Sequence, residues 1–267
     1  MKRKNKDSRS SIKLAFVFFI FVVLFITISL VFKVSVLIAN SKYDGANRFT
    51  IKVENGRQLM VISFASVPQS ISRLEIQDFP QDLNINKFLA IPTDASIVTS
   101  LDIKEEEVSD LMQRFFLNYG SLKTDLTIID ILKLYLLART IPKHYILERS
   151  ISASFSSVKA DKIAALLFKD ELIERENAVI EVVNTTDVVG LGGRLARVIS
   201  NMGGNVVIVR SLDKRQKHSA ISYFGKKNYT VGKLERVLGY ETFQMKTKTL
   251  ADVVIKIGTD SIGKDSF

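Results

Sequence analysis

Basic side chains gather in the C-terminal third of this 267-residue chain. Lys214, Arg215 and Lys217, then Lys226 and Lys227, flank a short run whose residues alternate like those of a strand. Residues 178–260 contain thirteen basic and seven acidic groups, a net charge of +6. Clustered cations attract anions. These five residues are therefore candidate contacts for an anionic polymer, lipid headgroups or an acidic partner, and the alternative is a solvated pair of loops.

A glycine cluster nearby has some features of a dinucleotide site. Gly190-Leu191-Gly192-Gly193 follows a strand pattern and opens a helix pattern, and Asp213 ends the next strand. The third glycine position of G-x-G-x-x-G falls on Leu195, however, and the second strand leads into another strand rather than a crossover helix. The pattern favours glycines that let the loop turn and the helix pack closely. We expect no nucleotide cofactor.

The composition of the chain excludes or disfavours several kinds of catalytic and metal site. The chain has no cysteine, which excludes disulfides, cysteine nucleophiles and cysteine-ligated zinc. Its only histidines are His144 and His218, so a histidine-rich metal site is not expected. Asp78 and Asp82 could pair as carboxylates, but they do not share a regular element, and a surface loop is the favoured interpretation.

The elements that would position these residues follow an apolar run, Leu14 to Phe32. Its nineteen residues carry no charge, and a helix of that length nearly spans a hydrocarbon core of ~30 Å. Backbone groups in lipid must be satisfied internally, which requires a helix. Six cations precede the run, and Lys33 is the only charge close behind it. The positive-inside rule therefore predicts a cytoplasmic N-terminus and an extracytoplasmic location for the residues after 33.

Two alternatives to an uncleaved signal-anchor remain open. A cleaved signal peptide has a shorter apolar region and a small-x-small cleavage site, whereas Leu37-Ile38-Ala39 begins with a bulky residue. A buried core helix rarely runs this long without a polar face. With the anchor as the favoured interpretation, the exterior cations lie away from cytoplasmic DNA and RNA, so no nucleic-acid partner is expected.

The exterior part begins with strand signals. After a tether at 33–48, residues 49–54, 59–64 and 71–76 predict a three-stranded meander with Asn55-Gly56 at its first turn. Residues 104–118 predict a helix, with Asp102 and Glu105 as a capping box. A second helix at 126–138 is apolar on nearly all sides, which predicts that it is central to the core. Serines between 150 and 157 indicate a linker.

The C-terminal segment alternates strands and helices. A bridging helix at 158–174 precedes strands at 179–183, 205–210, 219–224 and 252–257 and helices at 190–202 and 230–239, with 242–248 as a candidate edge strand. This β-α-β-β-α-β order predicts a small split-βαβ sandwich. The whole chain is therefore expected to be of the mixed α/β (α+β) class. Its expected parts are a basic tail at 1–13, a transmembrane helix at 14–32, the tether, a domain at 49–149, a linker with the bridging helix at 150–177, a domain at 178–260 and a tail at 261–267.

The C-terminal segment also carries a resemblance. The stretches at 182–186, 190–196 and 202–207, reading VVNTT, GLGGRLA and MGGNVV, are similar to the accessory domain of LytR/CpsA/Psr envelope proteins. The stretches at 219–224 and 252–260 are similar to that domain's later strands, and Thr185 replaces a glycine of the family pattern. The resemblance implies a bacterial cell-envelope protein.

Residues 49–149 more weakly resemble the family's catalytic domain. That domain transfers a lipid-linked glycopolymer to peptidoglycan, using acids for magnesium and arginines for pyrophosphate. Asp82 matches one of the acids, but Gln81 replaces an arginine and the later arginine-rich half has no counterpart. Neutralising a pyrophosphate requires several converging cations, and without them the site would stabilise the transition state little. The expectation is a degenerate, non-catalytic domain without a cofactor, and the alternative is a divergent magnesium-dependent phosphotransferase built on Asp82 and Arg73.

The sequence therefore predicts a single-pass envelope protein that binds or organises cell-wall polymer. Its contacts would be Lys214, Arg215, Lys217, Lys226 and Lys227, and its partners the membrane and an anionic envelope polymer or peptidoglycan.

Overall fold

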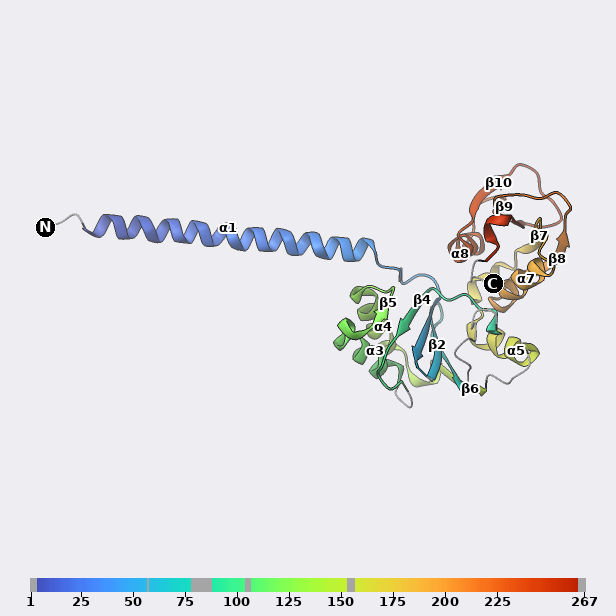
Figure 1. Ribbon diagram of the computed structural model, residues 1–267, viewed down its shortest axis with the longest axis horizontal. Coiled ribbons are helices and arrows are strands. Elements are labelled where there is room, and N and C mark those ends of the chain that lie inside the picture. Colours follow the sequence, from blue (N-terminus) through green and yellow to red (C-terminus); the bar gives the residue numbers. More distant parts are fainter. Residues whose placement is uncertain (1–3, 57, 78–87, 104–106, 153–156, 264–267) are drawn as a thin grey trace.

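The computed structural model describes residues 4–56, 58–77, 88–103, 107–152 and 157–263 (Figure 1). The helix α1 (Lys4–Ala39) extends alone from the rest of the molecule. Its apolar part, Leu14–Ala39, is the one stretch of the described chain long and apolar enough to cross a membrane, and none of it is buried. The alternative of a buried core helix is therefore wrong. By its length and composition this helix could anchor the protein in a membrane.

The first domain is built on a six-stranded sheet with the strand order β5-β4-β1-β2-β3-β6. The predicted meander is confirmed, because β1 pairs antiparallel with β2, and β2 with β3. β4 pairs in parallel with β1 and β6 with β3, and β5 pairs antiparallel with β4, so that β5 and β6 are the edge strands. The strands are β1 (Phe49–Asn55), β2 (Gln58–Ser66), β3 (Gln69–Gln77), β4 (Ala95–Val98), β5 (Lys123–Thr124) and β6 (Ile146–Ser152).

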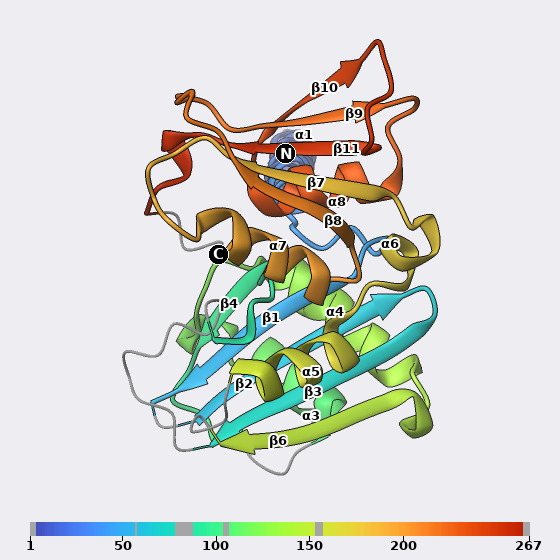
Figure 2. The same cartoon turned by 90° about the vertical axis from the view of Figure 1, so that its right-hand side faces the viewer.

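Helices cover both faces of this sheet (Figure 2). The strands therefore bury side chains on both faces. The helices α3 (Val108–Leu117) and α4 (Ile128–Thr140) pack on Ile51, Ile62 and Phe64. The helix α5 (Ser157–Phe168) packs on the opposite face, against residues such as Val61 and Leu74. Two short 3-10 helices, Tyr119–Ser121 and Lys143–Tyr145, flank α4.

The second domain has the predicted β-α-β-β-α-β order. Its five-stranded sheet runs β10-β9-β11-β7-β8, with α7 and α8 on one face. β7 and β8 are direct parallel neighbours, so the first βαβ unit is not split, and β11 lies between β7 and β9. The predicted edge strand is confirmed as β10. The elements are α6 (Glu171–Glu176), β7 (Val179–Asn184), α7 (Leu191–Asn201), β8 (Asn205–Ser211), β9 (Ala220–Phe224), α8 (Tyr229–Leu238), β10 (Glu241–Met245), β11 (Val253–Ile257) and a 3-10 helix, Thr259–Ser261.

Several predicted helix ends differ in the structure. The helix expected from 104 begins at Val108 with Glu107 as its N-cap, so the Asp102 cap was wrong, and residues 104–106 lie outside the described chain. The bridging helix breaks in two, because the Asp170 side chain accepts a hydrogen bond from Leu172 N and begins a new helix, α6. The first serines of the expected linker pair with β3 as the end of β6, and Ser157 begins α5.

The helix α4 is less buried than its composition predicted. Asp130, Ile131, Leu134 and Ala138 are its buried residues, whereas the side chain of Leu136 on the opposite side is 52% exposed. Its N-terminus is fixed by a capping box, in which Thr127 and Asp130 exchange hydrogen bonds. The helix therefore packs on the core with one side only.

Candidate functional site

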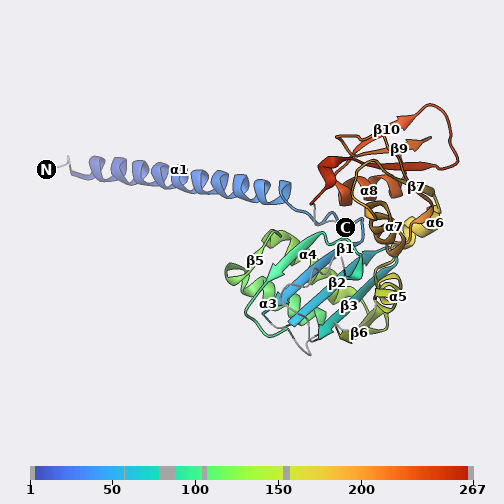
Figure 3. The same cartoon turned by 45° about the vertical axis from the view of Figure 1, so that its right-hand side comes forward.

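The helices α7 and α8 of the second domain lie between its sheet and the first domain (Figure 3). We call the contact surface between these two helices and the first domain the seam. Arg48, just before β1, lies in it. Its guanidinium donates to the Ser63 and Ser72 hydroxyls and to the carbonyl oxygens of Leu167 and Lys169, at 2.6 Å for Lys169. Burial lowers the pKa of Arg48 to about 10, against the opposing charges of Asp170 and Glu171. The guanidinium still remains charged at neutral pH, and it joins the meander to the C-terminal end of α5 and the link to α6.

A second buried cation crosses the seam from the other side. The Lys233 side chain of α8 is 4% exposed, and its Nζ donates a 2.6 Å hydrogen bond to the carbonyl oxygen of Arg48. The same Nζ lies 3.6 Å from Oδ1 of Asp94. Asp94 is itself fixed, because its other carboxylate oxygen accepts from Thr50 N at 2.7 Å. A buried charge is stable only when paired and hydrogen-bonded, so these contacts hold α8 against the first domain.

Three further sets of polar contacts lie at or beside the seam. The hydroxyl of Tyr229 donates a 2.7 Å hydrogen bond to Asp170, and burial together with this carboxylate raises the pKa of Tyr229. On α7, the Asn201 amide donates to the carbonyl oxygens of Leu89 and Ala90. The Arg197 side chain pairs with Asp161 of α5 at 2.6 Å. The contacts of Asn201 and Arg197 thus join α7 to the first domain.

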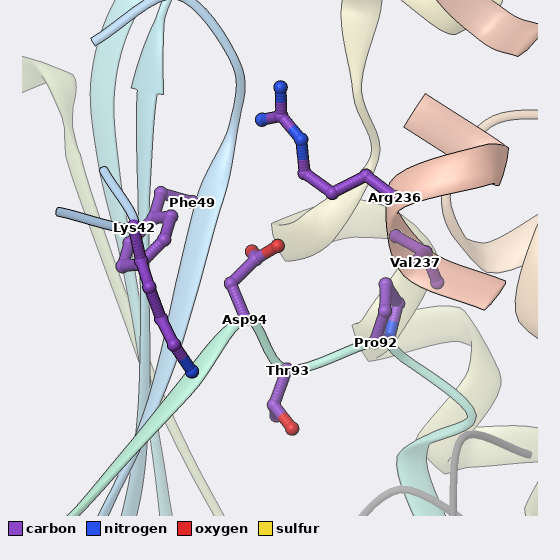
Figure 4. Close-up of a pocket in the computed structure, with 7 residues that line it drawn as sticks. All are labelled: Lys42, Phe49, Pro92, Thr93, Asp94, Arg236 and Val237. Atoms are coloured by element: carbon purple, nitrogen blue, oxygen red, sulfur yellow. The ribbon is translucent and has the colours of Figure 1, made fainter. Parts of the chain in front are cut away.

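A cavity of about 330 Å³ opens where the tether meets the seam (Figure 4). Phe49, Pro92 and Val237 supply apolar walls, and Lys42, Thr93, Asp94 and Arg236 supply polar groups. Lys42 pairs with Asp125 of the first domain, and Arg236 of α8 pairs with Asp44 of the tether at 2.7 Å. The cations around the cavity thus have protein carboxylates as partners. The arrangement joins the tether to both domains and has the volume to accept a small polar group.

The five predicted contact residues fall into two groups at opposite ends of β9. Lys214, Arg215 and Lys217 lie in the loop before this strand, and Lys226 and Lys227 in the loop after it. Arg215 pairs with Asp187 at 2.7 Å, and Lys227 pairs with Glu235 at 2.5 Å. Lys214, Lys217 and Lys226 are exposed. The structure therefore places three of the five together and does not gather all of them into one small site.

Of the two residues of the transferase alternative, only Arg73 lies within the described chain, and it does not contact the seam. Asp82, like Asp78, lies outside the described residues. Arg73 is a buried residue of β3, whose guanidinium contacts the carboxylates of Glu75 and Glu148. Over the described residues, no group of three or more histidine or acidic side chains is arranged to hold a metal ion.

The glycines at 190–193 shape the turn before α7 and its packing on the sheet, as the sequence predicted. Gly190 has φ +79°, which a glycine adopts without strain before α7. A Cβ on Gly192 would lie 3.3 Å from Val209 of β8 and 3.4 Å from Asn184 of β7. The small residue therefore lets α7 approach the sheet closely.

The segment that forms the second domain matches the family described as LytR cell envelope-related transcriptional attenuator. Residues 177–260 form a LytR C-terminal domain. The LytR domain begins directly after α6 and includes all five strands of the sheet β10-β9-β11-β7-β8. The match does not include residues 49–149, and it associates the chain with the cell envelope.

Other comparisons add little. A crystal structure described as the transcriptional regulator yvhJ from Bacillus subtilis is 13% identical, with a TM-score of 0.31, over 39% of this chain and 82% of that one. A likeness this distant carries no argument about the LytR domain or its neighbour. No curated protein sequence matches the chain.

Proposed function

We propose that this protein is a single-span, membrane-anchored module of the bacterial cell envelope. Its N-terminus lies in the cytoplasm, the residues after 33 lie outside the membrane, and the exterior part binds or organises cell-wall polymer without catalysing a reaction. One observation carries the proposal: an exposed apolar helix, Leu14–Ala39, precedes a LytR C-terminal domain at 177–260 in the same chain. The first domain, on this proposal, is a degenerate relative of the LytR/CpsA/Psr catalytic domain.

The polymer contacts are the cations at the two ends of β9. Lys214 and Lys217 project from one loop and Lys226 from the other, and all three are exposed. An extended polyanion can contact charges that lie apart along a strand, whereas a small ligand cannot. Exposed charges attract such a polymer less as salt rises, because added ions screen them within about 10 Å at 0.1 M.

Co-sedimentation with purified wall sacculi tests this function. The full chain in detergent micelles should pellet with sacculi at moderate salt and less at high salt. The double variant Lys214→Glu/Lys217→Glu should pellet less, whereas Arg149→Glu/Lys162→Glu, with the same charge change on exposed residues of the first domain, should pellet like the wild type. Failure of the wild type to pellet, or equal loss in both variants, would contradict the proposal.

The alternative function is a divergent phosphotransferase that uses Asp82 and Arg73 with magnesium. Arg73 does not favour it, because its side chain is 5% exposed and lies against two glutamates. Binding of an isoprenoid diphosphate that requires magnesium and disappears in Asp82→Ala would support the transferase and contradict the non-catalytic module.

A further inference from the structure

The helix α4 carries an apolar side that the body of the protein buries only in part. Ile131, Leu134 and Ala138 pack in the core of the first domain. Ile129, Leu132 and Leu136 lie on the opposite side of the helix, one to two turns apart. Ile129 and Leu132 are half-buried, and Leu136 is 52% exposed. A helix that is apolar all round is normally covered on every side, by protein or by lipid.

The structure also fixes α4 to the exit of the apolar helix α1. Ser41 follows the last residue of α1 by two positions, and its hydroxyl donates a 2.6 Å hydrogen bond to Asp130 in the first turn of α4. The amide of Tyr43 donates to the same oxygen at 2.9 Å. From the next turn of α4, the Lys133 Nζ donates to Ser41 Oγ and to the Tyr43 carbonyl oxygen, at 3.0 and 3.2 Å. The chain therefore reaches α4 within four residues of leaving α1.

The layers of the first domain are stacked along the direction of α1. Figures 1 and 3 show α3, α4 and β5 at the end of the body beside the last turns of α1. In Figure 2, which looks along α1, α5 lies in front of the six-stranded sheet and α3 and α4 lie behind it, on the side from which α1 arrives. The side of α4 that faces away from the sheet therefore faces the medium that surrounds α1.

The chemistry of this surface matches that of a lipid headgroup region. By helical spacing Lys133 and Arg139 flank the apolar side, and both are exposed, as is Lys123 of β5. The Arg139 guanidinium lies 5.7 Å from the centre of the Tyr135 ring and donates to its hydroxyl. Tyrosine is enriched at membrane–water interfaces, and juxtamembrane cations are attracted to anionic lipids. Leucine and isoleucine on one side with cations at its margins are typical of a helix that lies in the interface.

We propose that α4 is a membrane-surface helix, with Ile129, Leu132 and Leu136 inserted among the headgroups of the bilayer that α1 crosses. The inference rests on the proposed anchoring by α1. It holds the first domain with its α3–α4 layer on the membrane and presents the LytR domain from a fixed position beside it. The other candidate cover for this apolar side is a second copy of the chain, and the test separates the two.

Single tryptophans provide the test, because the chain has none of its own. The full chain is placed in nanodiscs of anionic and neutral lipid, with some lipids brominated near the headgroup or deep in the acyl chains. Leu136→Trp reports on α4, and Leu166→Trp, 61% exposed on α5, is the matched control on the opposite side of the sheet. Phe25→Trp, within α1, reports on the anchor itself.

Leu136→Trp should emit at shorter wavelength than Leu166→Trp and should lose emission to the lipids brominated near the headgroup, because an interfacial helix inserts about 5–10 Å. Phe25→Trp should lose emission to the deeply brominated lipids. If Phe25→Trp is quenched and Leu136→Trp is quenched no more than Leu166→Trp, α4 does not lie on the membrane. A shorter-wavelength emission of Leu136→Trp without quenching would overturn the proposal in favour of a second copy. If Phe25→Trp is not quenched, the anchoring itself fails, and the proposed function fails with it.

Discussion

The hydroxyl of Ser41 donates a 2.6 Å hydrogen bond to Oδ1 of Asp130, a residue 89 positions later in the chain. The same carboxylate accepts from the Tyr43 amide and from the amide and hydroxyl of Thr127, and it is fully buried. One side chain thus caps α4 and holds the tether. The polar contacts of Arg48 and Lys233 then extend this attachment to the second domain.

Asp130→Asn should destabilise the exterior part of the protein. The amide of asparagine cannot accept from all the donors that converge on the carboxylate, and leaving buried donors unsatisfied costs about 1–3 kcal/mol. We expect a lower midpoint of thermal unfolding, followed by circular dichroism of the full chain in micelles. Asp110→Asn, at an exposed position in the first turn of α3, is the control and should change the midpoint little. Equal midpoints for the two variants would show that Asp130 does not hold the tether.

Acid should weaken the attachment of the tether. Burial alone would raise the pKa of Asp44, but hydrogen bonds from Asn47, Ala46 and Arg236 outweigh it and lower this pKa from 3.8 to about 2. A carboxyl group with a lowered folded-state pKa adds stability above its unfolded-state pKa, and that stability is lost as pH falls through the folded-state value. The unfolding midpoint should therefore fall between about pH 4 and about pH 2.

Asp44→Asn isolates the contribution of this group. The variant cannot titrate at this position, so its midpoint should fall less steeply over the same acid range than that of the wild type. Identical pH profiles for the two proteins would mean that the ion pair with Arg236 does not stabilise the seam.

Lys233→Met should loosen the contact between the two domains. The methionine keeps the apolar stem but removes the donor to the Arg48 carbonyl oxygen and the cation near Asp94, both within a buried site. The loss should be about 1–3 kcal/mol of unfolding free energy. Denaturant titration of the full chain measures it, with Lys226→Met at an exposed position as the control. A stability equal to that of the control would exclude a structural role for Lys233.

Two glycines of the LytR domain should respond in opposite directions to alanine. A Cβ on Gly204 would lie 2.5 Å from Cγ2 of Ile199, so Gly204→Ala should destabilise the domain through overpacking, by about 1–3 kcal/mol. Gly193 lies within α7 with open space around it, so Gly193→Ala should stabilise the helix by about 0.5–1 kcal/mol. Melting curves that shift in the same direction for both would contradict this assignment of the packing.

The sequence predicted the elements that depend on local patterning. The meander between 49 and 77 and the alternating strands and helices after 179 were correct because turn residues and hydrophobic periodicity act over a few neighbouring residues. The helix boundaries near Asp102 and Asp170 were wrong. The first helix begins only after Glu107, whose side chain makes no capping hydrogen bond, and the Asp170 side chain caps a new helix inside the predicted bridging helix. Serine composition predicted a linker from 150 to 157, but its first residues, 150–152, pair with β3 and form the end of β6.

The seam itself was not predictable from one sequence. Arg48, Asp94 and Lys233 meet only after the two domains pack, and their separations in the chain follow no motif. A weak signal existed in α8, where Lys233 stands beside buried Leu234 on an otherwise apolar side. Composition did identify α4 as unusually apolar, but it could not distinguish burial in protein from exposure towards a membrane.

The topology on which the account depends can be measured with single cysteines, since the chain contains none. Leu250→Cys is 86% exposed in the LytR domain, and Ser8→Cys lies in the basic N-terminal tail. In intact cells, a membrane-impermeant maleimide should label Leu250→Cys, and it should label Ser8→Cys only after lysis. Labelling of Ser8→Cys in intact cells, with Leu250→Cys protected until lysis, would contradict an envelope protein anchored by α1.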